Sequence, residues 1–173
     1  MSVSNALTAS TVSPTSAPTI EIRALLPGDD AIAFRTLNEE WIARYFSLEA
    51  PDIETLGDPE TTILHKGGSI FMVYADSLPV GCVALIPLDQ GVYELSKMAV
   101  TPQLRGRGLG RRLLLHAIAQ ARLLGATSLF LGSNTRLADA VHLYESVGFR
   151  HVPPASLPPN PYARANVFMQ MPL

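Results

Sequence analysis

The segment Arg105 to Gly110 contains the residue types and spacing that point most directly to chemistry. Its alternating glycines at positions 106, 108 and 110 leave backbone N–H groups uncovered by side chains. A helix predicted to begin at Gly108 places about half a positive charge at the same point, so a phosphate or pyrophosphate is the expected ligand. This segment and the two residues after it carry four arginines: Arg105, Arg107, Arg111 and Arg112.

Two familiar nucleotide-binding loops do not fit this segment. A P-loop requires Gly-Lys-Ser/Thr after its glycines, and none follows here. The dinucleotide fingerprint requires a glycine where Arg111 stands and an acid about twenty residues further on, where residues 126–130 contain none. A glycine turn with solvated arginines stays open as an interpretation, whereas an RNA-binding patch is disfavoured because no aromatic residues interleave the loop.

Other reactive residue types give weaker patterns. The four histidines lack the paired spacing of metal ligands, so no metal is predicted. Cys82 lies in an apolar strand pattern and is interpreted as a buried thiol, and no serine-hydrolase elbow occurs.

A net charge of -2 disfavours nucleic acid and anionic membranes as partners, and no apolar run is long enough to span a bilayer. A single cysteine favours a reducing cytoplasm.

Periodicity predicts the elements that must position the glycine loop. Residues 1–18 carry no charge and are expected to form a disordered tail, with one domain over residues 19–173. In chain order we expect a strand from Thr19 to Pro27, a helix from Asp29 or Asp30 to about Phe46, a short helix from Asp58 to Gly67, strands over 69–75, 79–88 and 92–100, a helix over 108–124, a strand over 127–131, a helix over 137–147 and a strand over 167–171. The three central strands should be antiparallel neighbours, and one βαβ crossover should follow them. The expected fold class is α+β.

An ordered set of motifs then carries a family resemblance. The segments ELSKMAV, R-x-x-G-x-G, Ser133-Asn134 and ADAVHLYESVGF together resemble the GNAT superfamily of acetyl-CoA-dependent N-acetyltransferases. The resemblance implies a twisted, mostly antiparallel mixed sheet of about seven strands flanked by helices. It also implies that the fourth and fifth strands splay apart and admit the pantetheine arm of coenzyme A.

The resemblance assigns coenzyme-binding roles to particular positions. Met98 N–H is the implied oxyanion donor, with Ala99 and Val100 continuing the pantetheine-binding main chain. Asn134 and Ala138 are expected to flank the pantetheine arm. The backbone amides implied to bind pyrophosphate are those of Arg105, Gly106, Arg107, Gly108, Leu109 and Gly110.

Two side chains are candidates for proton transfer. Glu94 has the same strand parity as Met98, which predicts that both side chains point to one face, and its position matches a general base in similar enzymes. Glu145 is the competing acid and is expected to face solvent. Tyr144 matches the general-acid tyrosine that lies close to the coenzyme sulfur in the family, and it also contacts coenzyme there; packing of its helix on the sheet is the alternative.

The acceptor site is predicted from residues that equally suit other roles. Trp41 and Tyr45 are candidate lining residues, although their spacing also suits a packed helix. Tyr162 and Arg164 follow a proline-rich loop, and Arg164 is a candidate for binding a substrate carboxylate. We expect acetyl transfer to a primary amine of a small molecule, such as an amino acid, with a homodimer implied by the resemblance. A non-catalytic acyl-CoA-binding module, a protein-binding adaptor and acetylation of a protein amine are the alternatives.

Overall fold

The computed structural model describes residues 17–156 and 160–173. The predicted tail over residues 1–18 lies outside the described residues except at its last two positions, as do Pro158 and Pro159 of the predicted proline loop. No helix within the described ranges is long and apolar enough to cross a membrane.

Among the described residues, a mixed sheet of seven strands forms the centre of the fold, in the order β1-β2-β3-β4-β5-β7-β6. Every pairing is antiparallel except that of β4 with β5, which are joined through the crossover helix α4. The predicted antiparallel trio, the βαβ crossover and the α+β class are therefore confirmed. The strands are β1 (Ile20–Ala24), β2 (Ser69–Ala75), β3 (Leu78–Pro87), β4 (Val92–Val100), β5 (Ser128–Ser133), β6 (Arg150–His151) and β7 (Val167–Pro172).

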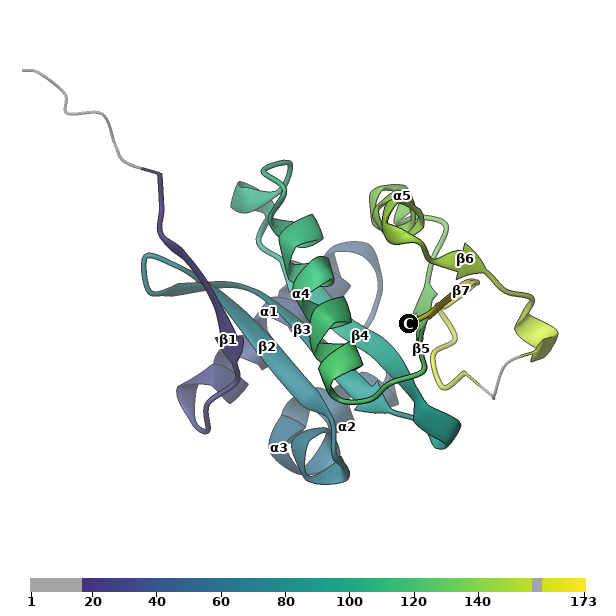
Figure 1. The fold of residues 1–173 in the computed structure, drawn as a ribbon. Coiled ribbons are helices and arrows are strands. Elements are labelled where there is room, and N and C mark those ends of the chain that lie inside the picture. The colour runs from purple at the N-terminus through teal and green to yellow at the C-terminus, as the bar shows by residue number, and fades with distance from the viewer. Residues whose placement is uncertain (1–16, 157–159) are drawn as a thin grey trace, which may run out of the picture.

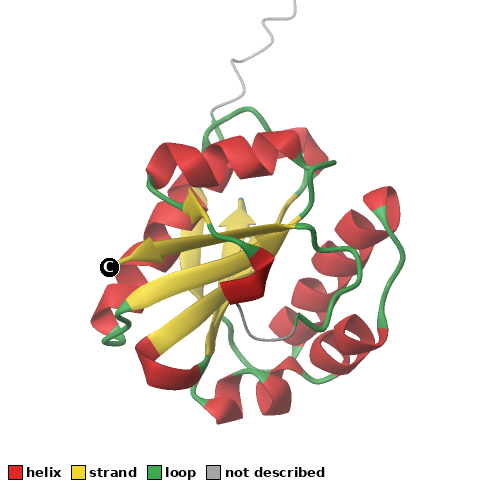
Figure 2. Cartoon of the chain, turned by 90° about the vertical axis from the view of Figure 1, so that its right-hand side faces the viewer, coloured by secondary structure: helices red, strands yellow, loops and turns green. Residues whose placement is uncertain are grey.

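Helices cover both faces of the sheet and bury two separate apolar cores (Figures 1 and 2). On one face, α4 buries Leu113, Leu114 and Ala117 against the sheet, and α5 packs beside it. On the other face, α1 buries Phe34 and Ile42 together with residues of α2 and the turn after α3. The helices are α1 (Asp29–Tyr45), α2 (Ala50–Gly57), α3 (Pro59–Thr62), α4 (Leu109–Leu123) and α5 (Ala138–Val147).

The region between α1 and β2 differs from the prediction. Asp58 accepts a hydrogen bond from Thr61 N at 3.0 Å, as expected of a helix cap, but α3 has only four residues and a short 3-10 turn follows it. The preceding helix α2 was not predicted. Its start is held by a reciprocal capping box between Glu49 and Asp52, which replaces the usual Ser or Thr at the first position.

Strands β4 and β5 pair over three residues only and then separate. The parallel register ends at Glu94 and Phe130, whereas β4 continues to Val100 and β5 to Ser133. Figure 1 shows the two strands diverging beside α4 and α5. The splay implied by the resemblance is therefore present, and it leaves one edge of β4 without a strand partner.

A β-bulge lies in the part of β4 that no longer pairs with β5 but still pairs with β3. Ala84 faces Ser96 and Cys82 faces Ala99, so Lys97 and Met98 together oppose the single residue between Ala84 and Cys82. Lys97 has a φ of 52°, in the left-handed region that non-glycine residues rarely adopt. Such bulges re-aim side chains and occur often beside functional sites.

Candidate active site

A cleft of about 630 Å³ opens where β4 and β5 separate. Its walls come from β4, the glycine loop, the end of β5, the start of α5, the end of α1 and the segment after residue 160. Of the predicted site residues, only Arg107 and Leu109 do not line it; Leu109 is buried in the core under α4. The predicted residues that line it are Trp41, Tyr45, Glu94, Met98, Ala99, Val100, Arg105, Gly106, Gly108, Gly110, Asn134, Ala138, Tyr144, Tyr162 and Arg164.

The glycine loop presents bare backbone to this cleft. Gly106 and Gly108 have φ values of 72° and 74°, and a Cβ built on either would meet no atom within 4 Å. Glycine adopts this left-handed conformation without strain, and the missing side chains leave the backbone open to a ligand. In the part of the chain that the structure describes, the N–H groups of Leu109, Gly110 and Arg111 have no hydrogen-bond acceptor. The beginning of α4 can therefore bind an anion.

Arg105 and Arg111 connect the glycine loop and the start of α4 to neighbouring elements. Arg105 donates from Nε to the Val100 carbonyl and from a terminal nitrogen to the Tyr45 hydroxyl, each at 3.2 Å. Arg111 donates to Ser146 Oγ at 2.9 Å and so joins α4 to α5. The loop is thereby fixed to the end of α1 and to the helix on the far side of the cleft.

The bulge contradicts the prediction that Glu94 and Met98 share a face. Glu94 lies directly opposite Ile86, which packs into the core under α1. Met98 instead packs against the core under α4. The parity argument failed because the bulge adds one residue between the two positions and reverses the alternation beyond it.

Glu94 lines the cleft from the α1 side of the sheet. Burial raises the pKa of its carboxyl group, while Lys97 and a hydrogen bond involving Ser96 act in the opposite direction. A carboxylate with a raised pKa is a stronger base than an exposed one. The competing acid Glu145 is exposed and lies 2.8 Å from His151, away from the cleft-lining set.

Tyr144 lines the cleft from α5. Its ring packs edge-on against Phe149 at 5.9 Å, and burial raises the pKa of its phenol to about 12. Among the described residues no group hydrogen-bonds its hydroxyl, so the proton is available to a ligand in the cleft.

Cys82 is a buried free thiol, as predicted. Burial raises its pKa to about 12, so the thiol stays protonated at neutral pH. It accepts a hydrogen bond from Asn38 Nδ2 at 3.3 Å and donates to the Lys97 carbonyl at 3.5 Å. Its role in the fold is therefore to satisfy a carbonyl of the bulge rather than to act as a nucleophile.

A buried cluster of charges lies beside the cleft, where the bulge of β4 meets α2 and the C-terminal segment. Asp52 is fully buried and accepts from Lys97 Nζ at 2.7 Å and from two nitrogens of Arg164 at 2.6 and 2.9 Å. Lys97 also donates to the Tyr162 hydroxyl at 2.9 Å, and Arg164 donates to Glu49 at 3.1 Å. The guanidinium that the sequence suggested for a substrate carboxylate is thus bonded to carboxylates of this chain.

Asn134 and the aromatic residues at the end of α1 line the cleft and also make structural contacts. Asn134 Nδ2 donates to the Arg164 carbonyl at 2.5 Å, which ties the end of β5 to the C-terminal segment. Trp41, Tyr45 and Phe46 pack against one another with ring centroids 6.2 to 6.4 Å apart. Trp41 and Phe46 also pack on the core, as the packing interpretation predicts, whereas acceptor binding by Trp41 and Tyr45 stays a prediction.

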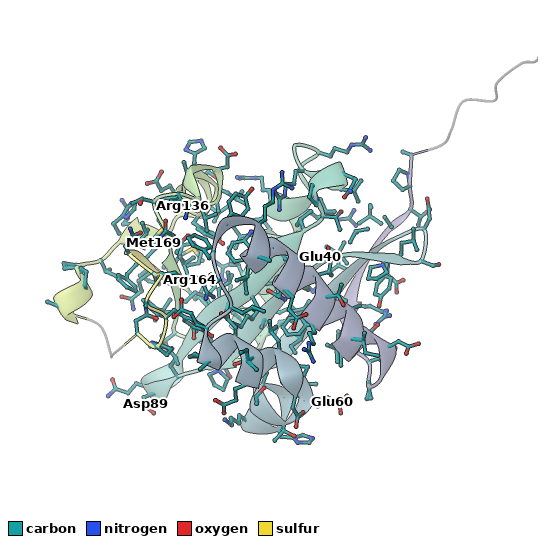
Figure 3. All side chains as sticks on the ribbon, turned by 180° about the vertical axis from the view of Figure 1, so that it is seen from behind. Glu40, Glu60, Asp89, Arg136, Arg164 and Met169 are labelled. Carbon is teal, nitrogen blue, oxygen red and sulfur yellow. The ribbon has the colours of Figure 1, made fainter. Side chains whose placement is uncertain are left out.

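Sequence reasoning missed four polar residues of this region. Asn38 is buried on the apolar face of α1, and Lys97 is a buried cation within an apolar strand; either could have been found as a polar residue inside an apolar stripe. Asp52 gave no signal because its helix was not predicted, and Arg136 gave none because it lies in a loop. Figure 3 places Arg136 and Arg164 in the same region of the molecule.

No cluster of three or more histidine, cysteine, aspartate or glutamate residues suited to a metal ion exists among the described residues. The cleft is lined by the exposed backbone of the glycine loop and by the side chains of Glu94 and Tyr144, groups that can bind an anion and transfer protons. This arrangement can bind a phosphorylated coenzyme and act on a group attached to its far end.

Comparison with known proteins identifies the family. Residues 33–149 match the acetyltransferase (GNAT) family model, and the chain belongs to this family. YjgM of Escherichia coli, described as an uncharacterised N-acetyltransferase, is 31% identical over 138 residues, covering 75% of this chain and 81% of that protein.

Two further relatives extend the comparison. The amino-acid acetyltransferase of Azotobacter vinelandii is 36% identical over 102 residues, which are 58% of this chain and 22% of that protein. An acetyltransferase of the GNAT family from Staphylococcus aureus has the same fold, with a TM-score of 0.82 and 22% identity over 89% of this chain and 99% of that one. The protein is therefore an acetyl-CoA-dependent N-acetyltransferase.

Proposed function

We propose that the protein transfers the acetyl group of acetyl-CoA to a primary amine of a small molecule by direct attack of the amine on the thioester. The observation that carries this proposal is the single cleft, which runs from the unpaired N–H groups at the start of α4 to Glu94 and Tyr144. An anion site and two proton-transfer groups therefore border one continuous space. The resemblance of the motifs supports the same assignment.

The coenzyme would be held by backbone groups. The free N–H groups of Leu109, Gly110 and Arg111 suit a pyrophosphate. The edge of β4 beyond Glu94 has no strand partner, so its backbone groups are available to the amides of a pantetheine arm. Met98 lies on this edge, and its N–H is the proposed donor to the thioester oxygen in the transition state.

Glu94 is the proposed general base. An alkylamine has a pKa of about 10.4, so presenting it unprotonated at pH 7 costs about 4.6 kcal/mol. The raised pKa of Glu94 lets its carboxylate compete better for that proton. The amine nitrogen then forms a bond to the acetyl carbon, and the carbon–sulfur bond breaks.

Tyr144 is the proposed general acid. The departing sulfur is a thiolate whose conjugate acid has a pKa of about 8.5, like that of cysteine. The Tyr144 phenol remains protonated at neutral pH and can donate its proton to this sulfur. Cys82 takes no part because it is buried and protonated.

Calorimetric titration with acetyl-CoA tests the coenzyme assignment, with dephospho-CoA and NADH as controls. Gly108→Glu should abolish saturable binding because the new carboxylate would occupy the anion site. Gly125→Glu is the matched control, since Gly125 has a similar φ of 79°, is equally uncrowded and ends α4 away from the cleft. Absence of binding to folded wild-type protein would refute the proposal.

A screen of primary amines by thiol release tests the transfer step. Release that depends on an amine supports transfer to a small molecule. Saturable coenzyme binding with no release for any small amine would instead favour a binding module or a protein amine as acceptor. The lone cysteine makes the cytoplasm the proposed compartment.

A further inference from the structure

We infer that the acceptor amine carries a carboxylate, and that Arg136 is the specificity-determining residue that binds it. This inference rests on the proposed function, because it assigns the substrate class of the same cleft. It replaces the sequence-based assignment to Arg164, whose guanidinium is bonded to Asp52 and Glu49.

Among the described cations that line the cleft, Arg136 is the one whose side chain makes no hydrogen bond or ion pair. Lys97 pairs with Asp52, and Arg164 pairs with Asp52 and Glu49, whereas Arg105 and Arg111 donate to neutral oxygens of Val100, Tyr45 and Ser146. Within residues 17–156 and 160–173, the Arg136 guanidinium makes neither a hydrogen bond nor an ion pair. It lines the cleft with all its donors free.

The Arg136 side chain rests on an aromatic surface. Its guanidinium carbon lies 5.3 Å from the centre of the Phe46 ring, and Phe46 packs against Tyr45 and Trp41. Stacking covers one face of the guanidinium plane and leaves the nitrogens at its edge free. A carboxylate binds best to this edge, through two parallel hydrogen bonds.

The backbone that carries Arg136 is held on both sides. Asn134 Oδ1 accepts from Arg136 N at 2.8 Å, and the Asn134 carbonyl accepts from Leu137 N at 2.9 Å. Asn166 Oδ1 accepts from Thr135 N at 2.9 Å, and its amide nitrogen donates to Thr135 Oγ1 at 3.2 Å. A turn anchored in this way lowers the entropic cost of positioning the arginine.

The charges of the cleft then match an amine that bears a carboxylate. Among the described residues, the carboxylates that line the cleft are those of Glu94 and Asp139, and neither forms an ion pair, so a cationic amine is attracted. Arg136 supplies the complementary charge for an acid group. The other anion that could bind Arg136 is a phosphate of acetyl-CoA. A substrate carboxylate and a coenzyme phosphate would both bind Arg136 through charge-assisted hydrogen bonds. The KM of the amine and the KM of acetyl-CoA distinguish these two ligands.

The test compares amino acids with their α-carboxamides, which keep the amine and lose the charge of the α-carboxylate. Steady-state thiol release is measured for glutamate, aspartate, methionine and phenylalanine and for the corresponding amides, at fixed and at varied acetyl-CoA. We expect at least one acid to have a KM about 10- to 100-fold lower than its amide, as expected for a charge-assisted bidentate contact.

Three variants test whether Arg136 causes this preference for the acid over its amide. Arg136→Ala should raise the KM of the preferred acid toward that of its amide and leave the KM of acetyl-CoA unchanged, whereas Arg136→Lys should recover part of the preference. Arg122→Ala is the control, because Arg122 is exposed in the last turn of α4 and does not line the cleft. Both positions are exposed, so thermal melting should confirm that the three variants fold.

The outcomes separate this inference from the proposed function. Equal KM values for acids and amides, or an Arg136→Ala effect on acetyl-CoA alone, would overturn the inference while leaving amine acetylation in place. Coenzyme binding without acetylation of any amine or amide would refute the proposed function, and the inference with it.

Discussion

Replacing Asp52 by asparagine tests whether burial or distance decides the strength of an ion pair in this protein. Asp52 is fully buried and lies 2.7 Å from Lys97, whose side chain is 4% exposed. The pair Arg35–Glu39 on α1 has an N–O distance of 2.6 Å, but its side chains are 53% and 34% exposed. Distance alone therefore predicts equal effects for Asp52→Asn and Glu39→Gln.

Burial predicts a large difference between these two variants. Removing one partner of a buried pair leaves an uncompensated charge and costs about 3–5 kcal/mol. Removing one partner of an exposed helical pair costs about 0.3–0.5 kcal/mol. Combining Asp52→Asn with Lys97→Met should recover part of the loss, because the uncompensated cation of Lys97 is then gone.

Urea unfolding followed by circular dichroism measures these free energies. The difference in the free energy of unfolding comes from the midpoints when the slopes agree. A loss of less than about 1 kcal/mol for Asp52→Asn, or a loss equal to that of Glu39→Gln, would refute the reasoning. The thiol-release rate of Asp52→Asn should also fall, because Asp52 holds the Lys97 and Arg164 side chains that line the cleft.

Three further predictions follow. Glu94→Gln should remove the inflection of kcat/KM that ionisation of Glu94 produces, which in the wild type is expected at a pH above the usual carboxyl range because burial raises the pKa of Glu94, and should leave the rise caused by deprotonation of the amine itself; a retained inflection would exclude Glu94 as base. Tyr144→Phe should lower kcat with little change in acetyl-CoA affinity, and an unchanged kcat would leave it a packing role. Burial opposes ionisation of Asp30, but hydrogen bonds from Arg23, Tyr74 and Leu26 N lower its pKa to about 2, so the stability it contributes should persist above pH 4 and be lost between about pH 4 and 2; in Arg23→Ala, urea midpoints should begin to fall at higher pH.

Much of the fold follows from local patterns. The strands β2, β3 and β4 are short apolar runs separated by turn residues, and one face of α4 has buried apolar residues at helical spacing, namely Leu109, Leu113, Leu114, Ala117, Ile118 and Ala121. These signals depend on neighbouring residues, so they can be interpreted without the tertiary structure. The helix α2 carries no such signal, because its capping box uses Glu49 and Asp52 and its sequence holds few apolar residues.

The candidate site likewise has one part that follows from local sequence and another part that depends on the tertiary structure. The glycine loop could be predicted because its conformation and its free N–H groups depend on consecutive residues. The contacts of Arg164 could not, because Asp52 is 112 residues away in the sequence and lies on the helix that was missed. The faces of Glu94 and Met98 could not be predicted either, since the bulge between them depends on the register of β3.

Side-chain bonds hold the structure together where backbone pairing between β4 and β5 ends. Beyond Glu94 the two strands share no ladder, yet Asn134 at the end of β5 is joined to the C-terminal segment through the Arg164 carbonyl. The Arg164 side chain is in turn bonded to Asp52, which accepts a hydrogen bond from Lys97 in the bulge of β4. The separated strands are therefore reconnected around the cleft rather than across it. Because this path runs through buried charges, the cleft stays open without losing the rigidity that precise positioning of the thioester and the amine requires.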